Sequence, residues 1–498
     1  MKTLFPITLS LLLFHSIAIA DDRPNILLIM PDQLRACSLG CYGDTQVITP
    51  NIDQLAKEGI LFRHMIANTP VCCPARAVLL TGTYAHTNGM IANDLRLREE
   101  LVTLPEILQA QGYRTGFVGK WHLDGGVREP GFVPPGPRRQ GFEFWAAYQC
   151  HHRHFAPTYF RDTPEVIQKT VFEPEASCDF AVEFLESQPA GKPFFLTVQM
   201  GPPHDPYGAP EKYMDLYEVD KIQPRGNWVA GSETRKAPTR PLLSSKGPVP
   251  PFVPVGGKEE LAASYAAITA IDDQVGRLVE VLKKTGLEDN TIVLFLSDHG
   301  DMLGSHGLRR KRKIYEESAA VPGIIRWPAK APAGRVIETL FSHVDVAPTL
   351  LRLAGVPTPE EMQGTDLSAV VRGETEEGPE AVLLAQYVPF VPDQVTEPWR
   401  GIRTSRYSYA RTEEGPMLLF DNESDPYQKK NLANLPEFAD LGKNLDAILQ
   451  KMMTDNGDSW RIGTRESVED GAKLYKHKTF YTLDEYFAWA KANPEKVK

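Results

Sequence analysis

Several clusters of polar side chains in this sequence carry groups that bind cations or transfer protons. Each cluster directly follows a short apolar run. The residues are Asp32 and Gln33, Lys120 and His122, His204, and Asp298 and His299. Oxygen donors dominate in the first and last of these pairs, which favours Ca²⁺, or Mg²⁺, over Zn²⁺ as a bound metal. The alternative for the two aspartates is that they only cap the turns after the runs.

A pair of adjacent cysteines offers a different chemistry. Cys72 and Cys73 are followed by Pro74, which suits the first turn of a helix. A thiolate at Cys72 would then be activated by the backbone N–H groups and the dipole of that helix. A soft thiol fits poorly with a hard cation held by oxygen ligands. The mismatch disappears if Cys72 is converted to a group that carries oxygen.

The elements that must position these residues are strands alternating with helices. Short apolar runs predict strands buried on both faces. They are Asn25–Met30, Thr115–Val118, Phe194–Met200, Thr291–Leu296 and Gly323–Arg326. Helices are predicted at Pro50–Glu58, after the capping box of Thr103 and Glu106, and at Asp272–Leu282. This order predicts an α/β fold with a large mixed, mainly parallel sheet between helices, whose carboxyl ends gather the polar clusters at one edge.

The whole chain divides into three predicted parts. Residues 1–20 have the pattern of a signal peptide, residues 21–378 the catalytic domain, and residues 379–498 a C-terminal subdomain with a small antiparallel sheet and a helix. We therefore expect an exported protein with no membrane span in the mature chain. Only one N-x-S/T sequon is present, at Asn422, which favours a bacterial periplasmic or secreted protein over a glycosylated lysosomal one. Against 64 acidic residues there are 54 Lys and Arg, a net charge of −10 that argues against nucleic acid as a partner.

Ordered motifs along the chain resemble the formylglycine-dependent type I sulfatases, which are arylsulfatase-like members of the alkaline phosphatase superfamily. The Cys72–Arg76 segment, CCPAR, matches the C-x-P-[SA]-R signature in which the cysteine is oxidised to formylglycine (3-oxoalanine). Further segments resemble the family at 23–33, 49–56, 119–122, 271–278, 297–301, 306–308, 344–351 and 419–427. The resemblance implies an alkaline phosphatase-like fold and a sulfuric ester hydrolase.

The resemblance also implies a role for each residue of the site. Cys72 would become the formylglycine hydrate, held by Arg76, and the hydrate would share Ca²⁺ with Asp32, Gln33, Asp298 and His299. Lys120 and Lys311 would bind sulfate oxygens, His204 would protonate the leaving alcohol, and His122 would take the proton that releases sulfate. Two positions depart from the usual pattern. Gln33 replaces an aspartate and can still donate a carbonyl oxygen, without charge. His299 replaces an asparagine and offers nitrogen, a less natural Ca²⁺ ligand, so contact with the substrate sulfate or tuning of the site is its alternative role.

The expected substrate is a sulfate monoester, either a sulfated carbohydrate or an aryl sulfate, and a formylglycine-generating maturation enzyme is implied as a partner. Two other functions stay open, a phosphonate or phosphodiester hydrolase on the same scaffold and a non-catalytic binder of sulfated glycans. Side chains that suit a sugar subsite are Trp145, Tyr148, His151, His152, Arg153 and His154, with Arg225 and Trp228 as weaker candidates. The basic run at 309–313 could attract an anionic substrate. For the four residues beside Lys311, at 309, 310, 312 and 313, we expect a solvated loop instead.

Overall fold

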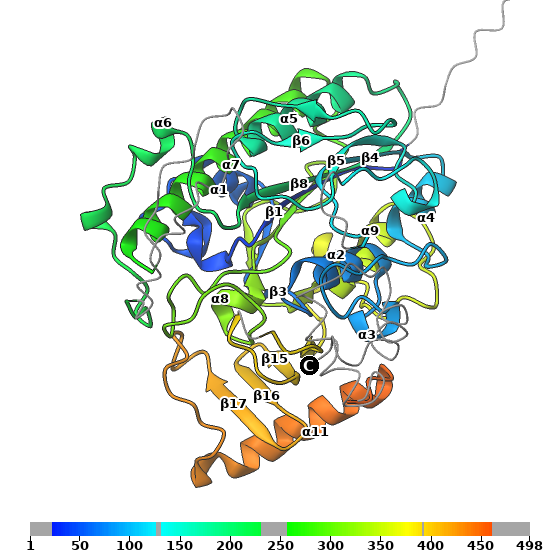
Figure 1. Cartoon of the computed structure of the whole chain (residues 1–498). Coiled ribbons are helices and arrows are strands. Elements are labelled where there is room, and N and C mark those ends of the chain that lie inside the picture. Colours follow the sequence, from blue (N-terminus) through cyan, green and yellow to red (C-terminus); the bar gives the residue numbers. More distant parts are fainter. Residues whose placement is uncertain (1–21, 126–130, 231–255, 391–392, 461–498) are drawn as a thin grey trace, which may run out of the picture.

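A large twisted sheet forms the centre of the molecule (Figure 1). The computed structural model describes residues 22–125, 131–230, 256–390 and 393–460. The sheet has eight strands in the order β12 (Arg335–Ile337), β2 (Ile60–Phe62), β11 (Gly323–Arg326), β9 (Thr291–Leu296), β1 (Asn25–Asp32), β8 (Phe194–Pro203), β4 (Arg114–Lys120) and β5 (Phe144–Tyr148).

The central strands run parallel, and the sheet becomes mixed at one edge. β1 pairs in parallel with β8 and β9, and β4 pairs in parallel with β8 and β5. β11 is antiparallel to both β9 and β2. Every residue of β1, β8 and β9 is buried, as expected for strands covered on both faces. The predicted mixed, mainly parallel sheet is therefore confirmed.

Helices cover both faces of this sheet (Figure 1). One layer contains α1 (Pro50–Lys57), α5 (Glu173–Glu186) and α7 (Lys258–Lys284). The other contains α2 (Cys72–Thr81), α4 (Leu104–Ala110) and α9 (His343–Leu353). The predicted capping box at the start of α4 is present, with the Thr103 backbone N–H and hydroxyl both donating to Glu106. α7 is much longer than the predicted Asp272–Leu282 helix.

A second sheet follows the main one along the chain. β14 (Ala381–Gln386), β15 (Trp399–Thr404), β16 (Tyr407–Arg411) and β17 (Pro416–Asp421) form four antiparallel strands in sequence order. α11 (Ala439–Asp455) packs against this sheet (Figure 1). The predicted small antiparallel sheet and helix are confirmed. The boundary between residues 378 and 379 stays a prediction, because one hydrophobic cluster extends from Leu28 of β1 to Leu383 of β14 and Leu445 of α11.

The remaining β-strands and α-helices of the described residues are short. They are β3 (Met65–Ile66), β6 (Thr158–Tyr159), β7 (Ile167–Gln168), β10 (Ala320–Val321), β13 (Phe341–Ser342), α3 (Ala85–Asn88), α6 (Glu211–Met214), α8 (Glu316–Ala319) and α10 (Ser368–Val371). Among the described residues, no helix has the length and apolar character needed to span a bilayer. The predicted signal peptide lies outside them, as do residues 231–255.

Candidate active site

The polar clusters predicted to converge do meet at the carboxyl edge of the central strands. Asp32 ends β1, Lys120 ends β4, and His204 directly follows β8. Asp298 and His299 lie just after β9. The parallel arrangement of these strands brings residues from distant parts of the sequence to one place, where α2 supplies Cys72.

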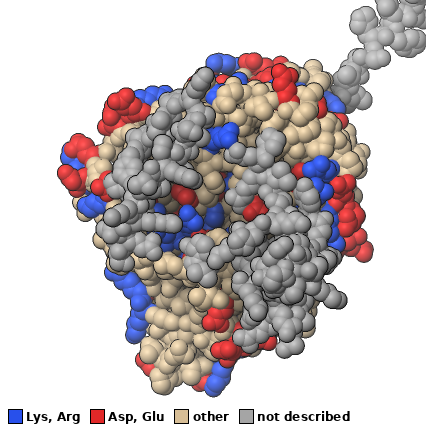
Figure 2. Space-filling model, in the orientation of Figure 1, with Lys and Arg blue, Asp and Glu red and all other residues tan. Residues whose placement is uncertain are grey.

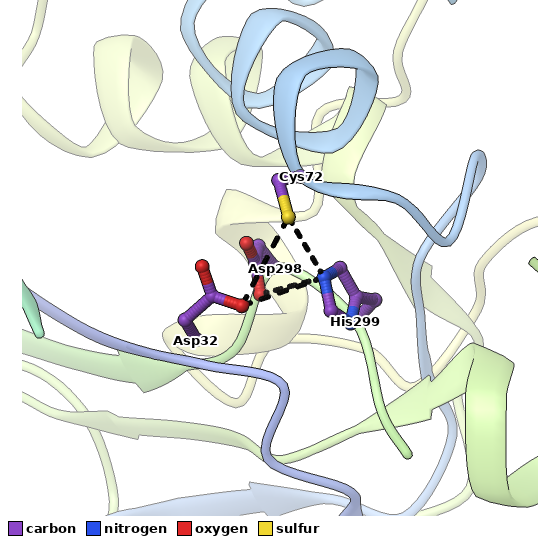
Figure 3. A group of neighbouring side chains, drawn as sticks. All are labelled: Asp32, Cys72, Asp298 and His299. Atoms are coloured by element: carbon purple, nitrogen blue, oxygen red, sulfur yellow. Dashed lines mark hydrogen bonds and ion pairs between the residues drawn. The ribbon is translucent and has the colours of Figure 1, made fainter. Parts of the chain in front are cut away.

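Four of these side chains form a compact buried group (Figure 3). One ligand atom from each of Asp32, Cys72, Asp298 and His299 lies within 4.8 Å of the others. His299 Nε2 is central, at 3.3 Å from Cys72 Sγ, 3.5 Å from Asp32 Oδ1 and 3.6 Å from Asp298 Oδ1. Two carboxylates, an imidazole and the side chain of residue 72 therefore surround one small volume.

α2 places Cys72 in this group. The helix begins at Cys72 and ends before Gly82, which adopts a left-handed conformation with φ +62°. Pro74 lies within the first turn, where its missing N–H costs no hydrogen bond. Every residue of the helix is buried, so the position of Cys72 is fixed by packing along the whole length of α2.

Arg76, one turn further along α2, neutralises the two carboxylates. Its Nη2 lies 3.0 Å from Asp32 Oδ2 and 2.9 Å from Asp298 Oδ2. Its Nη1 donates to the Lys120 carbonyl at 2.8 Å and to the Gln199 side chain. Since all these groups are buried, the guanidinium holds the ends of β1, β4, β8 and β9 together through charge-assisted hydrogen bonds.

Two buried lysines face the side chain of residue 72. Lys311 Nζ lies 3.1 Å from Cys72 Sγ, and Lys120 Nζ lies 3.9 Å from it. Lys120 also contacts Asp32 Oδ2 at 2.5 Å. Burial raises the pKa of Asp32 and Cys72 raises it further, but Lys120, Lys311 and Arg76 outweigh both and lower this pKa to about 2. Asp32 is thus an anion at neutral pH.

The same cations act on Cys72. Burial opposes ionisation of its thiol, but Lys120, Lys311 and His299 together hold its pKa well below the usual value. In contrast, burial raises the pKa of the neighbouring Cys73, whose Sγ donates to the His122 carbonyl at 2.8 Å. The two adjacent cysteines therefore differ in chemistry. Cys72 faces the polar centre, and Cys73 is a buried neutral thiol.

Two histidines complete the centre. His204 Nε2 accepts from Lys311 Nζ at 3.0 Å, and its Nδ1 donates to the Asp205 carbonyl at 2.7 Å. Burial lowers the pKa of His204, and Lys311 and His152 lower it further. His122 Nε2 contacts Asp94 Oδ1 at 3.1 Å. Burial lowers the pKa of His122, but Cys150, Cys73 and Asp94 outweigh burial and raise it well above the usual value.

Gln33 lies beside the metal-ligand group in a strained backbone conformation, with φ +69°. Its Nε2 donates to Asp301 Oδ2 at 2.7 Å, and its backbone N–H donates to Asp298 Oδ1 at 3.0 Å. Its Oε1 is buried and has no hydrogen-bond partner. An unpartnered buried carbonyl oxygen is costly unless another group, such as a cation, satisfies it.

Sequence reasoning missed the residues that hold the predicted ones in place. Asp94 contacts His122, Asp205 flanks His204, and Asp301 fixes Gln33. Gln199 accepts from Arg76 within β8. Asp205 and Asp301 lie within two residues of predicted site residues, so their proximity in sequence was an available signal. Asp94 and Gln199 gave none, because the tertiary fold alone brings them to the site.

The predicted sugar subsite is mostly wrong. Trp145 packs in the aromatic core, stacked on Phe117 with ring centroids 5.1 Å apart, and Tyr148 is buried with its hydroxyl on Glu173. His151 and His154 are also buried. Only His152 is exposed, and its ring stacks on His204 with centroids 4.5 Å apart. Trp145 and Tyr148 both lie on β5, where each packs into a different one of the two large hydrophobic clusters.

The weaker subsite candidates join distant parts of the chain instead. Arg225 contacts Glu317 Oε1 at 2.7 Å and donates to the Pro426 carbonyl at 2.9 Å. Trp228 forms a backbone bridge with Ser305. These contacts tie the segment before residue 230 to the loop after β9 and to the C-terminal part, which is a structural role.

The basic run from 309 to 313 is not a solvated loop. Arg312 and Lys313 are buried, and Arg312 Nε contacts Asp393 Oδ2 at 3.0 Å. Arg309 pairs with Glu260 at 2.5 Å. Arg310 has the most exposed side chain of the run, at 38%. Charge density alone could not separate these roles, because buried partners supplied by other elements decide them.

Comparisons with known proteins agree with this geometry. The family model described as Sulfatase matches residues 24–356, and the model described as N-sulphoglucosamine sulphohydrolase, C-terminal, matches residues 304–455. An ulvan-active sulfatase of Formosa agariphila is 38% identical over 445 residues, covering 88% of this chain and 83% of the relative. An N-acetylglucosamine-6-O-sulfatase of Bacteroides thetaiotaomicron is 29% identical, covering 87% of each chain.

Solved structures of other proteins have a similar fold. A structure in complex with its substrate D-glucosamine-2-N,6-O-disulfate matches with a TM-score of 0.76 and 26% identity, covering 88% of this chain and 99% of that one. A phosphonate monoester hydrolase of Agrobacterium radiobacter matches with a TM-score of 0.69 at 24% identity, covering 87% and 96%, a similarity that shows the fold alone. From the family match, the sheet and the residues gathered at its edge, we conclude that this chain belongs to the sulfatase family of the alkaline phosphatase superfamily.

Proposed function

We propose that this sulfatase removes sulfate from a sulfated carbohydrate, using residue 72 as a formylglycine hydrate beside a bound Ca²⁺. The observation that carries the proposal is the set of charged side chains that surround Cys72. Its Sγ lies 3.1 Å from Lys311 Nζ and 3.3 Å from His299 Nε2, within a group that includes Asp32 and Asp298. Anion-binding cations and metal-binding carboxylates thus meet at a single side chain.

The residues present fit a hard divalent cation. Asp32, Asp298 and the unpartnered Oε1 of Gln33 supply oxygen donors, which Ca²⁺ prefers, and Mg²⁺ accepts the same ligands. An oxygen at residue 72 would complete the set better than the thiol does. His299 would add a nitrogen, with Nε2 as its ligand atom. When bound, the cation would stabilise negative charge at residue 72 and at the sulfate.

Each remaining residue has a task that its geometry supports. The hydrated aldehyde at residue 72 supplies one hydroxyl to attack sulfur and a second that lets sulfate leave by elimination. Lys120 and Lys311 hold the sulfate oxygens as fixed positive charges. Arg76 fixes the two aspartates and helps position residue 72. These cations need no reorganisation during the reaction, because buried neighbours already hold them.

Proton transfer falls to the two histidines. His204 donates a proton from Nε2 to the oxygen of the departing alcohol. Burial and Lys311 disfavour the charged form of His204, and the negative charge of a bound sulfate ester offsets that effect. In its neutral form, His122 takes the proton from the second hydroxyl of residue 72 while Asp94 holds its Nε2, and the raised pKa of this imidazole favours the protonated product of that transfer. Sulfate then leaves and the aldehyde returns.

The carbohydrate part of the proposal rests on the relatives. By name, they act on ulvan, on N-acetylglucosamine 6-O-sulfate and on glucosamine disulfate. We further propose that a formylglycine-generating enzyme matures Cys72 and that residues 1–20 direct export to the periplasm or the medium, because the CCPAR motif and the N-terminal apolar run have those patterns.

Matched aryl esters test the reaction class. We expect the mature protein to hydrolyse 4-nitrophenyl sulfate with a higher kcat/KM than 4-nitrophenyl phosphate, bis(4-nitrophenyl) phosphate or 4-nitrophenyl phenylphosphonate. The matched control is Lys311→Ala, which removes a sulfate-binding charge and should lower activity on the sulfate ester. A strong preference for the phosphorus esters would replace this proposal with a phosphonate or phosphodiester hydrolase. Saturable binding of sulfated oligosaccharides without turnover of any ester would indicate a non-catalytic binder.

A further inference from the structure

The residues around His204 include a cation that the proposed reaction does not use. Arg310 lies one residue before Lys311, and its Nη2 lies 3.5 Å from Asp205 Oδ2. Asp205 Oδ1 in turn lies 3.2 Å from His204 Nδ1. Arg310 is therefore separated by one carboxylate from the histidine that faces the departing alcohol.

The pairing of Arg310 is looser than that of its neighbours. Its two carboxylate contacts measure 3.5 Å to Asp205 and 3.6 Å to Asp393. By comparison, Arg309 contacts Glu260 at 2.5 Å, and Arg312 contacts Asp393 at 3.0 Å. Distances of 3.5 Å and more lie at the limit of a charge-assisted hydrogen bond, so Arg310 retains donors for another partner.

Arg310 does not have its two nearby carboxylates, Asp205 and Asp393, to itself. Asp393 is already held by Arg312, and its backbone carbonyl accepts from Lys313. Asp205 Oδ1 also lies 3.2 Å from Nδ1 of His204, whose ring is neutral. The guanidiniums of Arg310 and Arg312 thus share the single carboxylate of Asp393, and the Arg310 side chain is 38% exposed while those of Arg312 and Asp393 are at most 2% exposed. Figure 2 shows Lys and Arg side chains in a hollow near the middle of this face.

A second feature of the rim faces the same histidine. The exposed ring of His152 stacks on His204 with centroids 4.5 Å apart and an interplanar angle of 19°. His204 is thus flanked by His152 on its ring face and by Asp205, next to Arg310, at Nδ1. A departing sugar that receives its proton from His204 would lie within reach of both.

We infer that Arg310 binds a second anionic group of the substrate, a carboxylate or a further sulfate on the sugar that carries or neighbours the scissile sulfate. This inference rests on the proposed sulfatase function and narrows its substrate class to polyanionic glycans. Both groups present planar or near-planar pairs of oxygens that a guanidinium contacts with two N–H donors. Arg310 would act in binding and specificity and would take no part in proton transfer.

The test compares substrates that differ only in the second charge. The probes are a sulfated disaccharide with a uronic acid neighbour, its uronate methyl ester, and the neutral disaccharide with one or with two sulfates. We expect wild-type protein to prefer the uronate over its methyl ester, or the disulfate over the monosulfate, by about ten-fold or more in kcat/KM. Which pair shows the preference identifies the second anion. The preference should decline as salt is raised, because Arg310 is partly exposed.

Variants then assign the preference to Arg310. R310Q should lower the selectivity ratio about ten-fold. R310K should retain part of the ratio, because lysine keeps the positive charge but lacks the paired N–H donors of the guanidinium. R309Q is the matched control, because Arg309 lies in the same run but pairs with Glu260. We expect R309Q to retain the ratio. Thermal unfolding midpoints establish that the variants fold.

Three outcomes would overturn the inference. If the wild-type protein cleaves sulfate esters with no preference for the charged neighbour, the inference about Arg310 is wrong and the proposed sulfatase function still stands. Equal losses on both members of a pair in R310Q would mean that Arg310 acts through Asp205 and His204 rather than on the substrate. A wild-type protein that cleaves no sulfate ester would instead overturn the proposed function, and this inference with it.

Discussion

At the scale of single residues, Gln33 depends on Asp301. Asp301 Oδ2 accepts from Gln33 Nε2 at 2.7 Å, which turns the unpartnered Oε1 away from Asp301. If Oε1 binds the metal, Asp301→Ala should weaken Ca²⁺ binding about 10- to 100-fold, as loss of a residue that orients a ligand commonly does. Calorimetric titration of Ca²⁺ into protein stripped with a chelator measures this directly, independently of turnover.

Tyr207→Phe is the matched control for that experiment. The Tyr207 hydroxyl donates to the same Asp301 oxygen at 2.6 Å but has no bond to Gln33. We expect this variant to bind Ca²⁺ nearly as well as wild type. Unchanged affinity in Asp301→Ala would exclude Gln33 as an oriented ligand, and an equal loss in Tyr207→Phe would point to general loosening of the pocket.

The reactive residues could be predicted from the sequence, but the residues that hold them in place could not. Cys72, Lys120 and His204 stand directly in motifs or after apolar runs, so pattern and position identified them. Asp94 has neither signal and reaches His122 only through the fold. The sequence could not predict which side chains are exposed. Trp145 was predicted to contact a sugar, but it lies in the hydrophobic core. Burial depends on tertiary contacts, which cannot be identified from a single sequence.

At the scale of elements, a buried ion pair fixes the C-terminal segment to the second sheet. Arg400 of β15 holds Asp458, which follows α11, through Nε at 2.5 Å and Nη2 at 3.0 Å. Both side chains are at most 1% exposed. Arg400→Leu should lower the free energy of unfolding by about 3–5 kcal/mol, because it leaves Asp458 charged and buried. Chemical denaturation monitored by fluorescence measures the change.

The double variant Arg400→Leu with Asp458→Leu separates two causes. Removing both charges should recover most of the lost stability, since two apolar groups can replace a buried ion pair at little cost. Arg406→Leu serves as a surface control, because the Arg406 side chain is 48% exposed, so water screens its pairing with Asp421 and we expect only a small change in stability. A single variant as stable as wild type would show that the buried pair contributes nothing.

Helix periodicity succeeded where one face of a helix meets solvent. The second half of α7 has that pattern and was predicted as Asp272–Leu282. The first half is buried on nearly every side, from Leu261 to Ile271, so its residues show no polar stripe. The same limit applies to α2, all of whose residues are buried. A helix inside a core carries little periodic signal.

At the scale of the whole molecule, buried neutral histidines make the fold sensitive to acid. Burial lowers the pKa of His343 from 6.5 to about 4, and it lowers those of His151 and His154 to about 3 and about 4. The unfolded chain therefore binds protons that the folded chain excludes. The resulting stability is present above pH 6.5 and is lost as pH falls toward 4.

His343→Gln isolates one of these contributions. The glutamine amide can replace the bond between His343 Nε2 and the Ser297 carbonyl, now 2.9 Å, but does not titrate. Between pH 7.5 and 5, wild type should lose about 2 kcal/mol more stability than this variant. Thermal unfolding at both pH values measures the difference. Equal losses in the two proteins would show that His343 is protonated, or solvated, in the folded state.

Sheet order could not be predicted at this scale. β1 lies between β8 and β9, which begin at Phe194 and Thr291, so its neighbours are distant in sequence. The apolar runs predicted that a mainly parallel sheet would form, and the fold confirmed it. Which strands pair, and that β11 runs antiparallel, depends on long-range packing that local patterns do not encode. Ordered family motifs supplied part of that missing information.

The most direct measurement of the central claim is the chemical state of residue 72 in protein of known activity. Preparations made with increasing amounts of a formylglycine-generating enzyme would be analysed by peptide mass spectrometry and by hydrolysis of 4-nitrophenyl sulfate. The account predicts that specific activity rises in proportion to the fraction of Cys72 converted to formylglycine. It also predicts that Cys72→Ala folds normally without turnover. Full sulfatase activity in protein whose residue 72 is unmodified cysteine, or in Cys72→Ala, would contradict it.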